Sequence, residues 1–526
     1  MRVVIGLFLK YFQMALYPYT CKVHTSKNHL NLKQFERLHV SKKVTEDGLD
    51  PNRWRALLVI AIAQLMVVLD ASIVNIAIPS AQRDLHISAA NRQWVVTAYT
   101  LAFGSLLLLG GRIADVVGRK KIFIIGLLGF AGASAIGGIA STQALLFAAR
   151  GLQGVFGALL APAALSLINV TFTLPKERAK AFGVYGAIAG GGAAIGLILG
   201  GTLTQYASWR WCLGVNVPIA LVAVVMALPW LHESHAEGEN SYDIPGAITV
   251  SLGLLSLVYG LSEAATKGWA KSSTYQFFIF AAILLVLFFV IESRVKHPLL
   301  PVRVLAERNR GGSYLATLLI GAGLFTMFLF LSIYFQNVLG YSALKSGFAF
   351  LPFSMGVITF AGVASTLLPK VGARPLMLTG LLMATIGLFY LSRFTPHSSY
   401  LTAILPALLI MSTGLALVFI PSATTGLHGI GGRDSGVASA MINTSQQIGG
   451  SLGAALLNTV AVTASSAYAT THTSLGKALP GFATVHGFSV AFRFGAIFLA
   501  IAAVIIALTI NVGKHAAESV EGVALH

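Results

Sequence analysis

The chain has 526 residues, of which 56% are hydrophobic and only 10% are charged, and its mean hydropathy is +0.78. Ordinary soluble domains carry about 25% charged residues, so this composition excludes a water-soluble monomer. The formal net charge of +18 would suggest nucleic acid binding on a soluble chain, but here the basic residues lie in short gaps between apolar stretches. Membrane topology explains that distribution, and no nucleic acid partner is expected.

Fourteen apolar stretches are long enough to cross a hydrocarbon core of about 30 Å as helices. The sequence predicts these spans at residues 56–79, 94–112, 121–140, 143–168, 180–204, 212–231, 245–263, 274–292, 313–337, 346–368, 375–392, 400–423, 436–465 and 488–511. The expected fold class is an all-α polytopic membrane protein. Cys21 and Cys212 lie far apart without CxxC or Cys/His spacing, so neither a disulfide framework nor a structural zinc site is indicated.

The gaps between the predicted spans differ in charge. Counted from the N-terminus, the even-numbered gaps carry more Lys and Arg than the odd-numbered gaps, and the residues before the first span are also basic. Basic flanks resist translocation, so both termini are predicted in the cytoplasm, with an extension at 1–52 and a tail at 512–526. The apolar start of the extension leaves open an interfacial helix, an uncleaved signal-like segment or a mis-assigned translation start.

The two halves of the chain show a weak repeat. The second span ends in ADVVGRKK and the tenth in LPKVGARP, so Gly118 and Gly372 correspond if spans 1–6 match spans 9–14. Such repetition is typical of transporters, whose sites lie between the repeats, although a coincidental glycine-plus-basic turn remains an alternative. The expected domains are an N-terminal six-helix bundle at 53–231, a linker with two inserted helices at 232–310, and a C-terminal six-helix bundle at 311–511.

Asp70 lies inside the first predicted span, in LDASIVNIAIP. A carboxylate near the middle of the membrane costs roughly 2.5–3.5 kcal/mol on insertion scales, so it should face a cavity or a partner. Burial disfavours the charged form, which makes Asp70 a candidate proton carrier. The alternative is a structural carboxylate that caps or bridges helices.

Arg150 lies in the fourth predicted span, in LLFAARGLQG. Asp70 and Arg150 are each about eight or nine residues from the outer ends of their spans, so a rise of 1.5 Å per residue places them at one depth. Their side chains can therefore meet. Motion between them would change how readily Asp70 takes up a proton, and a permanent structural ion pair is the alternative.

The gap between the second and third spans contains GGRIADVVGRKKIF, with Gly111, Asp115, Gly118 and Arg119. Glycine permits close backbone approach and positive φ at a tight turn, and Asp115 can face the positive N-terminal end of another helix. Such contacts can stabilise one of two conformations. The alternative is an ordinary basic cytoplasmic turn.

The fifth predicted span is rich in glycine. Gly192, Gly196 and Gly200 follow one another at intervals of four residues, so they share one helix face and would let a neighbouring helix pack backbone to backbone. A packing seam without further function is the alternative.

At this point the chain resembles a known family, the fourteen-helix drug:proton antiporters of the major facilitator superfamily (the EmrB/QacA-like group). The resemblance rests on six segments in chain order: LDASIVNIAIP, GRIADVVGRKK, RGLQGVFGA, the glycines of the fifth span, WRWCLGVNVP and GVASAMINTSQQIGGSLG. It implies two six-helix bundles that rock around a central cavity, with the seventh and eighth spans outside that core.

The resemblance also implies roles for individual residues. It assigns Asp70 and Arg150 to proton coupling, and Gly111, Asp115, Gly118 and Arg119 to a gating loop. It places five glycines in an antiporter signature: Gly183, Gly192, Gly196, Gly200 and Gly201. Leu197 replaces the usual proline of that signature, which puts the expected kink in doubt.

Several other polar residues lie in or near the predicted spans. Six are candidates for the substrate cavity, with interhelical hydrogen bonding as an equal alternative: Tyr99, Gln153, Gln336, Asn337, Asn443 and Gln446. Glu263 and Glu292 lie at span ends, where a solvated interfacial position is expected. His232, Glu233 and His235 lack metalloprotease spacing and lie in a gap, so no metal site is predicted.

The leading hypothesis for function is a secondary exporter in which a lipophilic compound and a proton compete for, or alternately occupy, the cavity containing Asp70. The tenth and thirteenth spans lack a clear carboxylate, which favours monovalent cationic, neutral or zwitterionic amphiphiles as substrates. Export of an endogenous metabolite, lipid or self-made antibiotic is the alternative. No enzyme activity or cofactor is expected, the expected location is a plasma membrane such as the bacterial inner membrane, and a periplasmic adaptor is left open.

Overall fold

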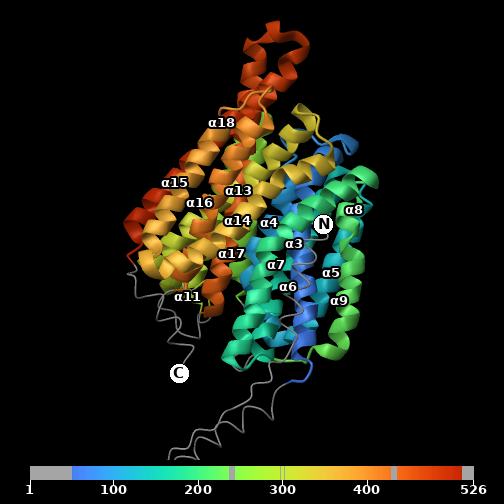
Figure 1. The fold of residues 1–526 in the computed structure, drawn as a ribbon, viewed down its shortest axis with the longest axis vertical. Helices are drawn as coiled ribbons and strands as arrows, with labels where there is room; N and C mark the ends of the chain where they lie inside the picture. Colours follow the sequence, from blue (N-terminus) through green and yellow to red (C-terminus); the bar gives the residue numbers. More distant parts are fainter. Residues whose placement is uncertain (1–49, 236–242, 296–297, 301, 428–434, 512–526) are drawn as a thin grey trace, which may run out of the picture.

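The computed structural model describes residues 50–235, 243–295, 298–300, 302–427 and 435–511, and Figure 1 shows their course. The expectations about residues 1–49 and 512–526 lie outside these described residues. Fourteen of the described helices are long and apolar enough to cross a membrane, which confirms the number of predicted spans.

The first six spans form an N-terminal half. Its helices are α3 (Arg53–Asp84), α4 (Trp94–Val117), α5 (Arg119–Gly138), α6 (Gln143–Thr171), α7 (Pro175–Tyr206), and the short α8 (Trp211–Gly214) followed by α9 (Asn216–Trp230). Helix α3 packs along α7, while α4 and α5 both pack against α6. Helix α7 runs without a break through Leu197, where the family resemblance raised the question of a kink.

The last six spans form a C-terminal half. Its helices are α12 (Val302–Ala306), α13 (Arg308–Ile333) with a π-helical turn η1 (Tyr334–Val338), α14 (Ala343–Val371), α15 (Ala373–Leu391), η2 (Tyr400–Ile404) with α16 (Leu405–Gly426), α17 (Ser435–Thr471), and η3 (Thr473–Ala478) with α18 (Leu479–Thr509). Helix α13 packs along α17, and α15 packs along both α16 and α18. The halves lie side by side in Figure 1.

Two inserted helices, α10 (Ile244–Lys267) and α11 (Ser272–Arg294), separate the halves in sequence. Helix α10 packs against α4 of one half and α17 of the other. Ser262 of α10 accepts a hydrogen bond from Trp94 Nε1 (3.1 Å), and the Leu261 carbonyl accepts one from Thr459 Oγ1 (2.8 Å). The pair therefore lies across the seam between the halves, outside both bundles.

The predicted ends of the spans differ most at the last helix. Helix α18 begins at Leu479, whereas the apolar pattern predicted residue 488. The first turns of α18 contain glycine, proline and histidine, so hydropathy alone does not include them. Together with the end of α17 they project beyond the other helices (Figure 1).

The two glycine turns of the predicted repeat have similar backbone geometry. Gly118 joins α4 to α5 with φ 120°, and Gly372 joins α14 to α15 with φ 90°. Positive φ is rarely adopted by other residues, so both turns require glycine for the same reason. The two turns therefore share one backbone conformation, and the match of spans 1–6 to spans 9–14 stays a prediction.

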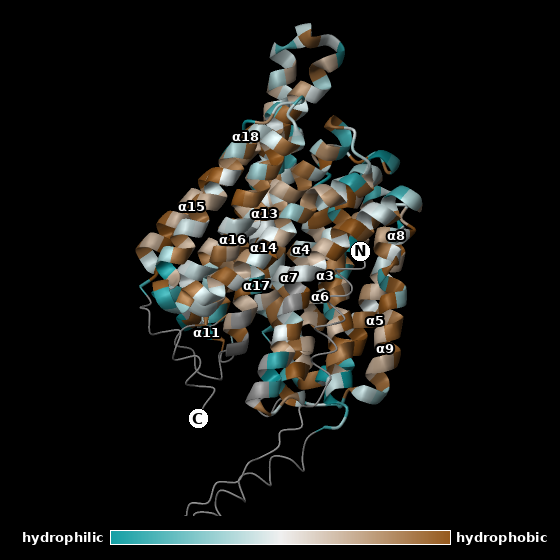
Figure 2. Cartoon of the chain, viewed as in Figure 1, coloured by the Kyte–Doolittle hydropathy of each residue, from teal (hydrophilic) through white to brown (hydrophobic). Residues whose placement is uncertain are grey.

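Hydrophilic residues gather at the helix ends and in the connecting turns, whereas hydrophobic residues cover the length of the helices (Figure 2). Many large apolar side chains on the outer faces are exposed, including Ile125, Val225, Ile283 and Val504. Such a band is what contact with lipid requires, since lipid chains solvate apolar side chains and leave backbone groups to pair within the helices.

Hydrogen bonds join the two halves at the end of the bundle that carries Asp84, here called the Asp84 end. Gln336 Nε2 donates to the Ile76 carbonyl (2.9 Å), and Arg83 Nη1 donates to Asn337 Oδ1 (3.2 Å). Nearby, Arg92 Nε donates to Asn458 Oδ1 (3.0 Å). The described conformation is therefore closed between the halves at the Asp84 end.

Candidate functional site: a buried charge network in the N-terminal half

The site is built on an ion pair between α3 and α6. Arg150 Nη1 donates to Asp70 Oδ2 at 2.7 Å, and the exposed fraction of both side chains is 0%. The prediction that these residues lie at one depth and can meet is confirmed by this contact. Of the alternatives left open by the sequence, a proton carrier and a permanent ion pair, the contact by itself selects neither.

Two further side chains complete the shell around Asp70. Gln153 Nε2 donates to Asp70 Oδ1 (2.9 Å), and Asn216 Nδ2 donates to the same oxygen (2.8 Å). Gln153 and Asn216 each also donate to Ser134 Oγ, at 2.6 and 3.2 Å. Helices α3, α6 and α9 thus meet at one carboxylate that accepts from three donors, and α5 adds Ser134, which accepts from two of the donor residues.

Arg150 is held by more than the carboxylate. Its Nε donates to the Val95 carbonyl (2.9 Å), its Nη1 also donates to Gln153 Oε1 (2.8 Å), and its guanidinium lies 4.6 Å from the centre of the Tyr99 ring. Burying a charge pair is costly unless such additional partners are present. Tyr99 and Gln153, both candidates for the substrate cavity, instead belong to this network.

The network is not fully satisfied. Arg150 Nη2 and Asn216 Oδ1 are buried without a hydrogen bond partner, which leaves one donor and one acceptor beside the ion pair. An unpaired buried polar group costs about 1–3 kcal/mol, so a water molecule that bonds to either atom would be stabilised here.

The position of the network bears on one expectation. Every side chain that bonds to Asp70 belongs to the N-terminal half, and Asp70 itself is 1% exposed. A compound bound between the halves would therefore not touch the carboxylate in this conformation. The hypothesis that compound and proton compete for, or alternately occupy, the cavity containing Asp70 stays a prediction, and in the described state the carboxylate is enclosed by its own bundle.

The predicted gating loop forms a compact turn. Asp115 Oδ1, in the last turn of α4, accepts from Nε and Nη2 of Arg119, the first residue of α5 (3.0 and 2.9 Å), so Asp115 pairs at the N-terminus of the next helix. Glu233 accepts from the backbone N–H groups of Lys120 and Lys121 (3.0 and 3.1 Å) and thereby caps α5. Gly111 lies against Pro162 of α6.

The predicted glycine seam is present on α7, with one exception. A Cβ at Gly192, Gly196 or Gly200 would collide with Val68, Ser72 or Ile73 of α3, so these three positions require close helix packing. Gly201 lies against Leu344 of α14 in the other half. Gly183 is different, since a Cβ there would meet nothing within 4 Å. Its assignment to the packing seam is wrong.

The other cavity candidates are divided. Gln336 and Asn337 make hydrogen bonds between the halves at the Asp84 end, so the interhelical alternative applies to them. Asn443 is exposed on α17, and Gln446 is partly buried on the same helix. These two positions do not join the charge network.

Two glutamates at helix ends, Glu263 and Glu292, are more buried than the sequence predicted. Glu263 is 9% exposed and pairs with Lys267 (2.8 Å), and Glu292 is 3% exposed and accepts from the Leu300 N–H (3.0 Å). The expected solvated interfacial position is wrong for both, because the helix ends pack against neighbouring segments.

Cys212 is a buried free thiol. Among the described residues, no group of three or more His, Cys, Asp or Glu side chains is placed to hold a metal ion.

Comparison with known proteins gives concordant results. Residues 60–454 match the model of the Major Facilitator Superfamily. The puromycin resistance protein pur8 of Streptomyces alboniger is 46% identical over 90% of this chain and 94% of its own length, and the cephamycin export protein CmcT of Amycolatopsis lactamdurans is 37% identical over 77% and 84%.

Solved structures share the fold. A bacterial homologue of the human lysosomal transporter Spinster, in an inward-facing and unoccupied conformation, has a TM-score of 0.60 at 17% identity and covers 88% of this chain and 98% of its own. An auto-inhibited peptide transporter of the POT family has a TM-score of 0.62 at 16% identity and covers 86% and 96%.

Proposed function

The chain belongs to the Major Facilitator Superfamily and is a multi-pass membrane protein, and from that premise we propose that it is a proton-coupled exporter of lipophilic or amphiphilic small molecules. The observation that carries the proposal is the buried Asp70–Arg150 pair, which is the one acid–base couple in the interior of the N-terminal half among the described residues. Relatives named for puromycin resistance and cephamycin export support the outward direction and the class of compound.

The proposed orientation places the Gly118 loop in the cytoplasm and the Asp84 end outside, in a bacterial inner membrane. The basic residues Arg119, Lys120 and Lys121 support this orientation, since basic residues next to a span stay on the cytoplasmic side. Both termini would then be cytoplasmic. In this orientation the described conformation would be closed between the halves on the outer side.

In the proposed cycle the proton acts through Arg150. Without a proton, Asp70 carries a full negative charge, and Arg150, Gln153 and Asn216 all donate to it. Protonation removes that charge, so the attraction between α3 and α6 weakens and the guanidinium can turn toward the other partners it already has. A change in the relative position of these helices biases the N-terminal half toward one of the two states.

Binding of the compound would therefore disfavour binding of the proton because the two stabilise different conformations, and not because they contact the same residue. A proton that stabilises one state and a compound that stabilises the other are coupled by the difference between their affinities for the two states. No cofactor is required in this scheme, because the proton gradient supplies the free energy.

Reconstituted proteoliposomes test the proposal, with puromycin as the first compound and cationic, neutral and zwitterionic amphiphiles as the panel that follows. Asp70→Asn should abolish transport driven by a pH gradient, since the amide cannot take up the proton. Glu177→Gln serves as the matched control, because it removes a partly exposed carboxylate of the same half that pairs with Arg53. Gradient-driven transport by Asp70→Asn at the parent rate would contradict the proton role.

A second candidate function is export of an antibiotic made by the host. The relatives favour it, since pur8 and CmcT come from Streptomyces alboniger and Amycolatopsis lactamdurans and are named for resistance to or export of an antibiotic. A single compound transported to the exclusion of the amphiphile panel would favour this candidate over a broad drug exporter.

A further inference from the structure

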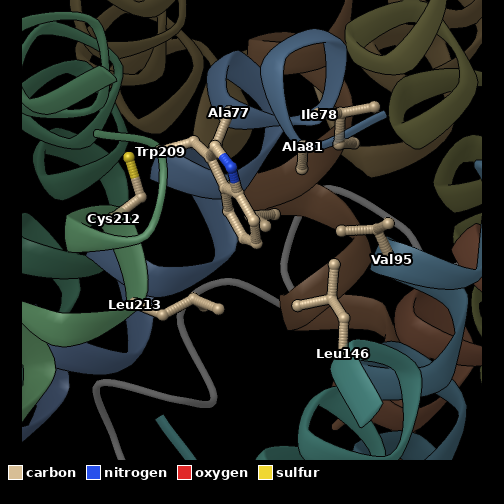
Figure 3. A pocket seen from close by; sticks show the side chains of 9 residues that line it. Ala77, Ile78, Ala81, Val95, Leu146, Trp209, Cys212 and Leu213 are labelled. Carbon is tan, nitrogen blue, oxygen red and sulfur yellow. The ribbon is translucent and has the colours of Figure 1, made fainter. Parts of the chain in front are cut away.

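A small pocket lies in the N-terminal half, and Figure 3 shows the side chains that line it. The space between its lining atoms amounts to about 220 Å³, including the part that opens to solvent, and only about 10 Å³ of it can take the centre of a water molecule, which is room for about one water. Its lining side chains are apolar apart from the Trp209 indole nitrogen and the Cys212 thiol. Side chains from α3, α4, α6 and α8 contribute to it, together with Trp209 just before α8. We refer to it below as the Trp209 void.

The void lies beside the charge network, about one helical turn away along α3, along α6 and along the segment from α8 to α9. Val74 follows Asp70 by four residues on α3, Leu146 precedes Arg150 by four on α6, and Cys212 precedes Asn216 by four. Four residues rise about 6 Å, close to one turn of helix. A fourth lining residue, Val95, provides the carbonyl that accepts from Arg150 Nε.

One face of α3 runs from the network to the surface. Beyond Asp70, the lining residues Val74, Ala77, Ile78 and Ala81 recur at helical spacing, and Asp84 continues the same face at the helix end. Fourteen residues separate the two carboxylates, a rise of about 21 Å. Asp70 and Asp84 therefore lie at opposite ends of one stripe, with the void between them.

A polar cluster closes the void toward the Asp84 end. The Trp209 indole N–H donates to Asp84 Oδ2 (2.9 Å), and Arg210 pairs with the same carboxylate. Arg210 also lies over the Trp209 ring at 4.6 Å and donates to the Ala140 carbonyl (2.9 Å). The Asp84 side chain is 46% exposed, so this cluster is where the stripe reaches solvent.

The lining of the void determines when it can conduct protons. Water in an apolar cavity finds few hydrogen bond partners, so such a cavity stays dry, and a dry gap stops proton transfer. Arg150 and Asn216 do not line the void but follow its lining residues Leu146 and Cys212 by four positions, and they carry a buried donor and a buried acceptor without a partner, Arg150 Nη2 and Asn216 Oδ1. Displacement of the Trp209 ring would join these polar atoms to the solvated Asp84 carboxylate.

We propose that the Trp209 void and the cluster of Trp209, Asp84 and Arg210 form the outer proton entrance to Asp70, separate from the path of the transported compound. Asp84 takes a proton from outside water, the proton passes through water in the opened void, and an O–H bond forms on Asp70 as one breaks on the neighbouring water. Asp84 is left ionised and pairs again with Arg210. The inference rests on the proposed function, since it presumes that Asp70 is protonated from outside.

The separate route has a structural reason. Asp70 is enclosed by groups of its own half, and the seam between the halves is closed at the same end by bonds such as Gln336 to Ile76. A path inside the N-terminal bundle would let a proton reach Asp70 from outside without opening this seam. Trp209 is a positioning residue in this scheme, since it controls water and does not carry the proton.

Cys212 provides a direct measure of whether the void becomes wet. In a Cys21→Ser background, a small water-soluble methanethiosulfonate added outside should modify Cys212 slowly in the parent and about tenfold or more faster in Trp209→Ala. Trp211→Ala is the matched control, because Trp211 is 55% exposed and does not line the void. Equal modification rates in Trp209→Ala and Trp211→Ala would overturn the inference without reference to transport.

Proton delivery is tested by filling the void. Ala77→Leu, with Ala81→Val as the second variant should the first fail to fold, should slow pH-gradient-driven puromycin transport about tenfold while puromycin exchange without a gradient stays at the parent rate. If Asp70→Asn abolishes driven transport but the filled variants match Trp211→Ala, the inference is wrong and the proposed function stands. If Asp70→Asn transports like the parent, the proposed function fails and the inference fails with it.

Discussion

The N-terminal half keeps an ion pair in its core, whereas the interior of the C-terminal half is filled with aromatic rings. Phe330 stacks on Phe488 with ring centres 4.6 Å apart, and Tyr334 meets Phe394 at 4.6 Å. Charged residues of the six C-terminal spans lie near the helix ends, apart from Arg493, which is exposed on α18. Both halves share one backbone plan, so the difference lies in what each half can respond to.

The contrast shows how two halves with a similar arrangement of helices can have different roles. An ion pair can change its energy by several kcal/mol when a single proton binds, because charges interact strongly away from water. An aromatic cluster has no protonation state to change and contributes shape and rigidity. Charge-dependent behaviour should therefore originate in the N-terminal half, with the C-terminal half as the stable surface against which it moves.

Arg92 connects the two kinds of interior. Its guanidinium lies 5.8 Å from the Phe330 ring and 5.2 Å from the Phe488 ring, and its Nε bonds to Asn458. Burial lowers the pKa of Arg92 to about 10, so the side chain is still charged at neutral pH. The aromatic rings of the C-terminal half thus stabilise a cation supplied by the N-terminal half, which helps to close the Asp84 end.

Breaking the ion pair should have the largest effect on stability. Arg150→Met leaves Asp70 charged and buried without its cation, which should lower the free energy of unfolding by about 3–5 kcal/mol. The double variant Asp70→Asn with Arg150→Met removes both charges, so it should recover most of that loss while still lacking gradient-driven transport. Denaturant unfolding in detergent measures the first effect, and proteoliposome assays measure the second.

The matched control for this experiment is Arg493→Met in the other half, because that arginine is exposed and its loss should change stability by less than about 0.5 kcal/mol. A single variant Arg150→Met as stable as the double variant would show that the pair is not what holds α3 to α6.

Phe330→Ala is expected to separate packing from coupling in the C-terminal half. Phe330 is fully buried, so its truncation should cost about 3 kcal/mol of unfolding free energy through lost contacts and a cavity. The number of protons exchanged per puromycin should stay unchanged, since the one charged group over the Phe330 ring, Arg92, has a pKa of about 10 and stays charged at neutral pH. Phe494→Ala, at a ring that is 43% exposed, is the control with a small expected loss. A changed proton number in Phe330→Ala would contradict the division between the halves.

Most of the fold could be predicted from the sequence because lipid imposes a simple rule. A spanning helix must be apolar over its length, and all fourteen spans satisfy this rule in the structure. The beginning of α18 was missed because its first turns lie beyond the apolar stretch, where hydropathy carries no signal.

The site could be predicted only in part. Asp70 and Arg150 stand out because charges are rare inside apolar stretches. Asn216 lies in WRWCLGVNVP, a segment that carried the family resemblance, but the pattern gave this residue no role beside Asp70, and the Val95 carbonyl is a backbone group that no pattern distinguishes. The sequence could not show whether Gln336 lines a cavity or bonds to α3, because a glutamine side chain suits both roles.

The smallest expected effect compares the two glycine turns, one in each half. Gly118→Ala and Gly372→Ala both place a side chain at positive φ, which costs of order 1–3 kcal/mol. A Cβ at Gly118 would also lie 2.7 Å from the Glu233 carboxyl carbon, so Gly118→Ala should cost about 1 kcal/mol more than Gly372→Ala by displacing the cap of α5. Combining Gly118→Ala with Glu233→Ala should then cost less than the sum of the two single variants in a double-mutant cycle of unfolding free energies. Strictly additive losses of unfolding free energy would contradict this expectation, because they would show that Glu233 stabilises α5 independently of Gly118.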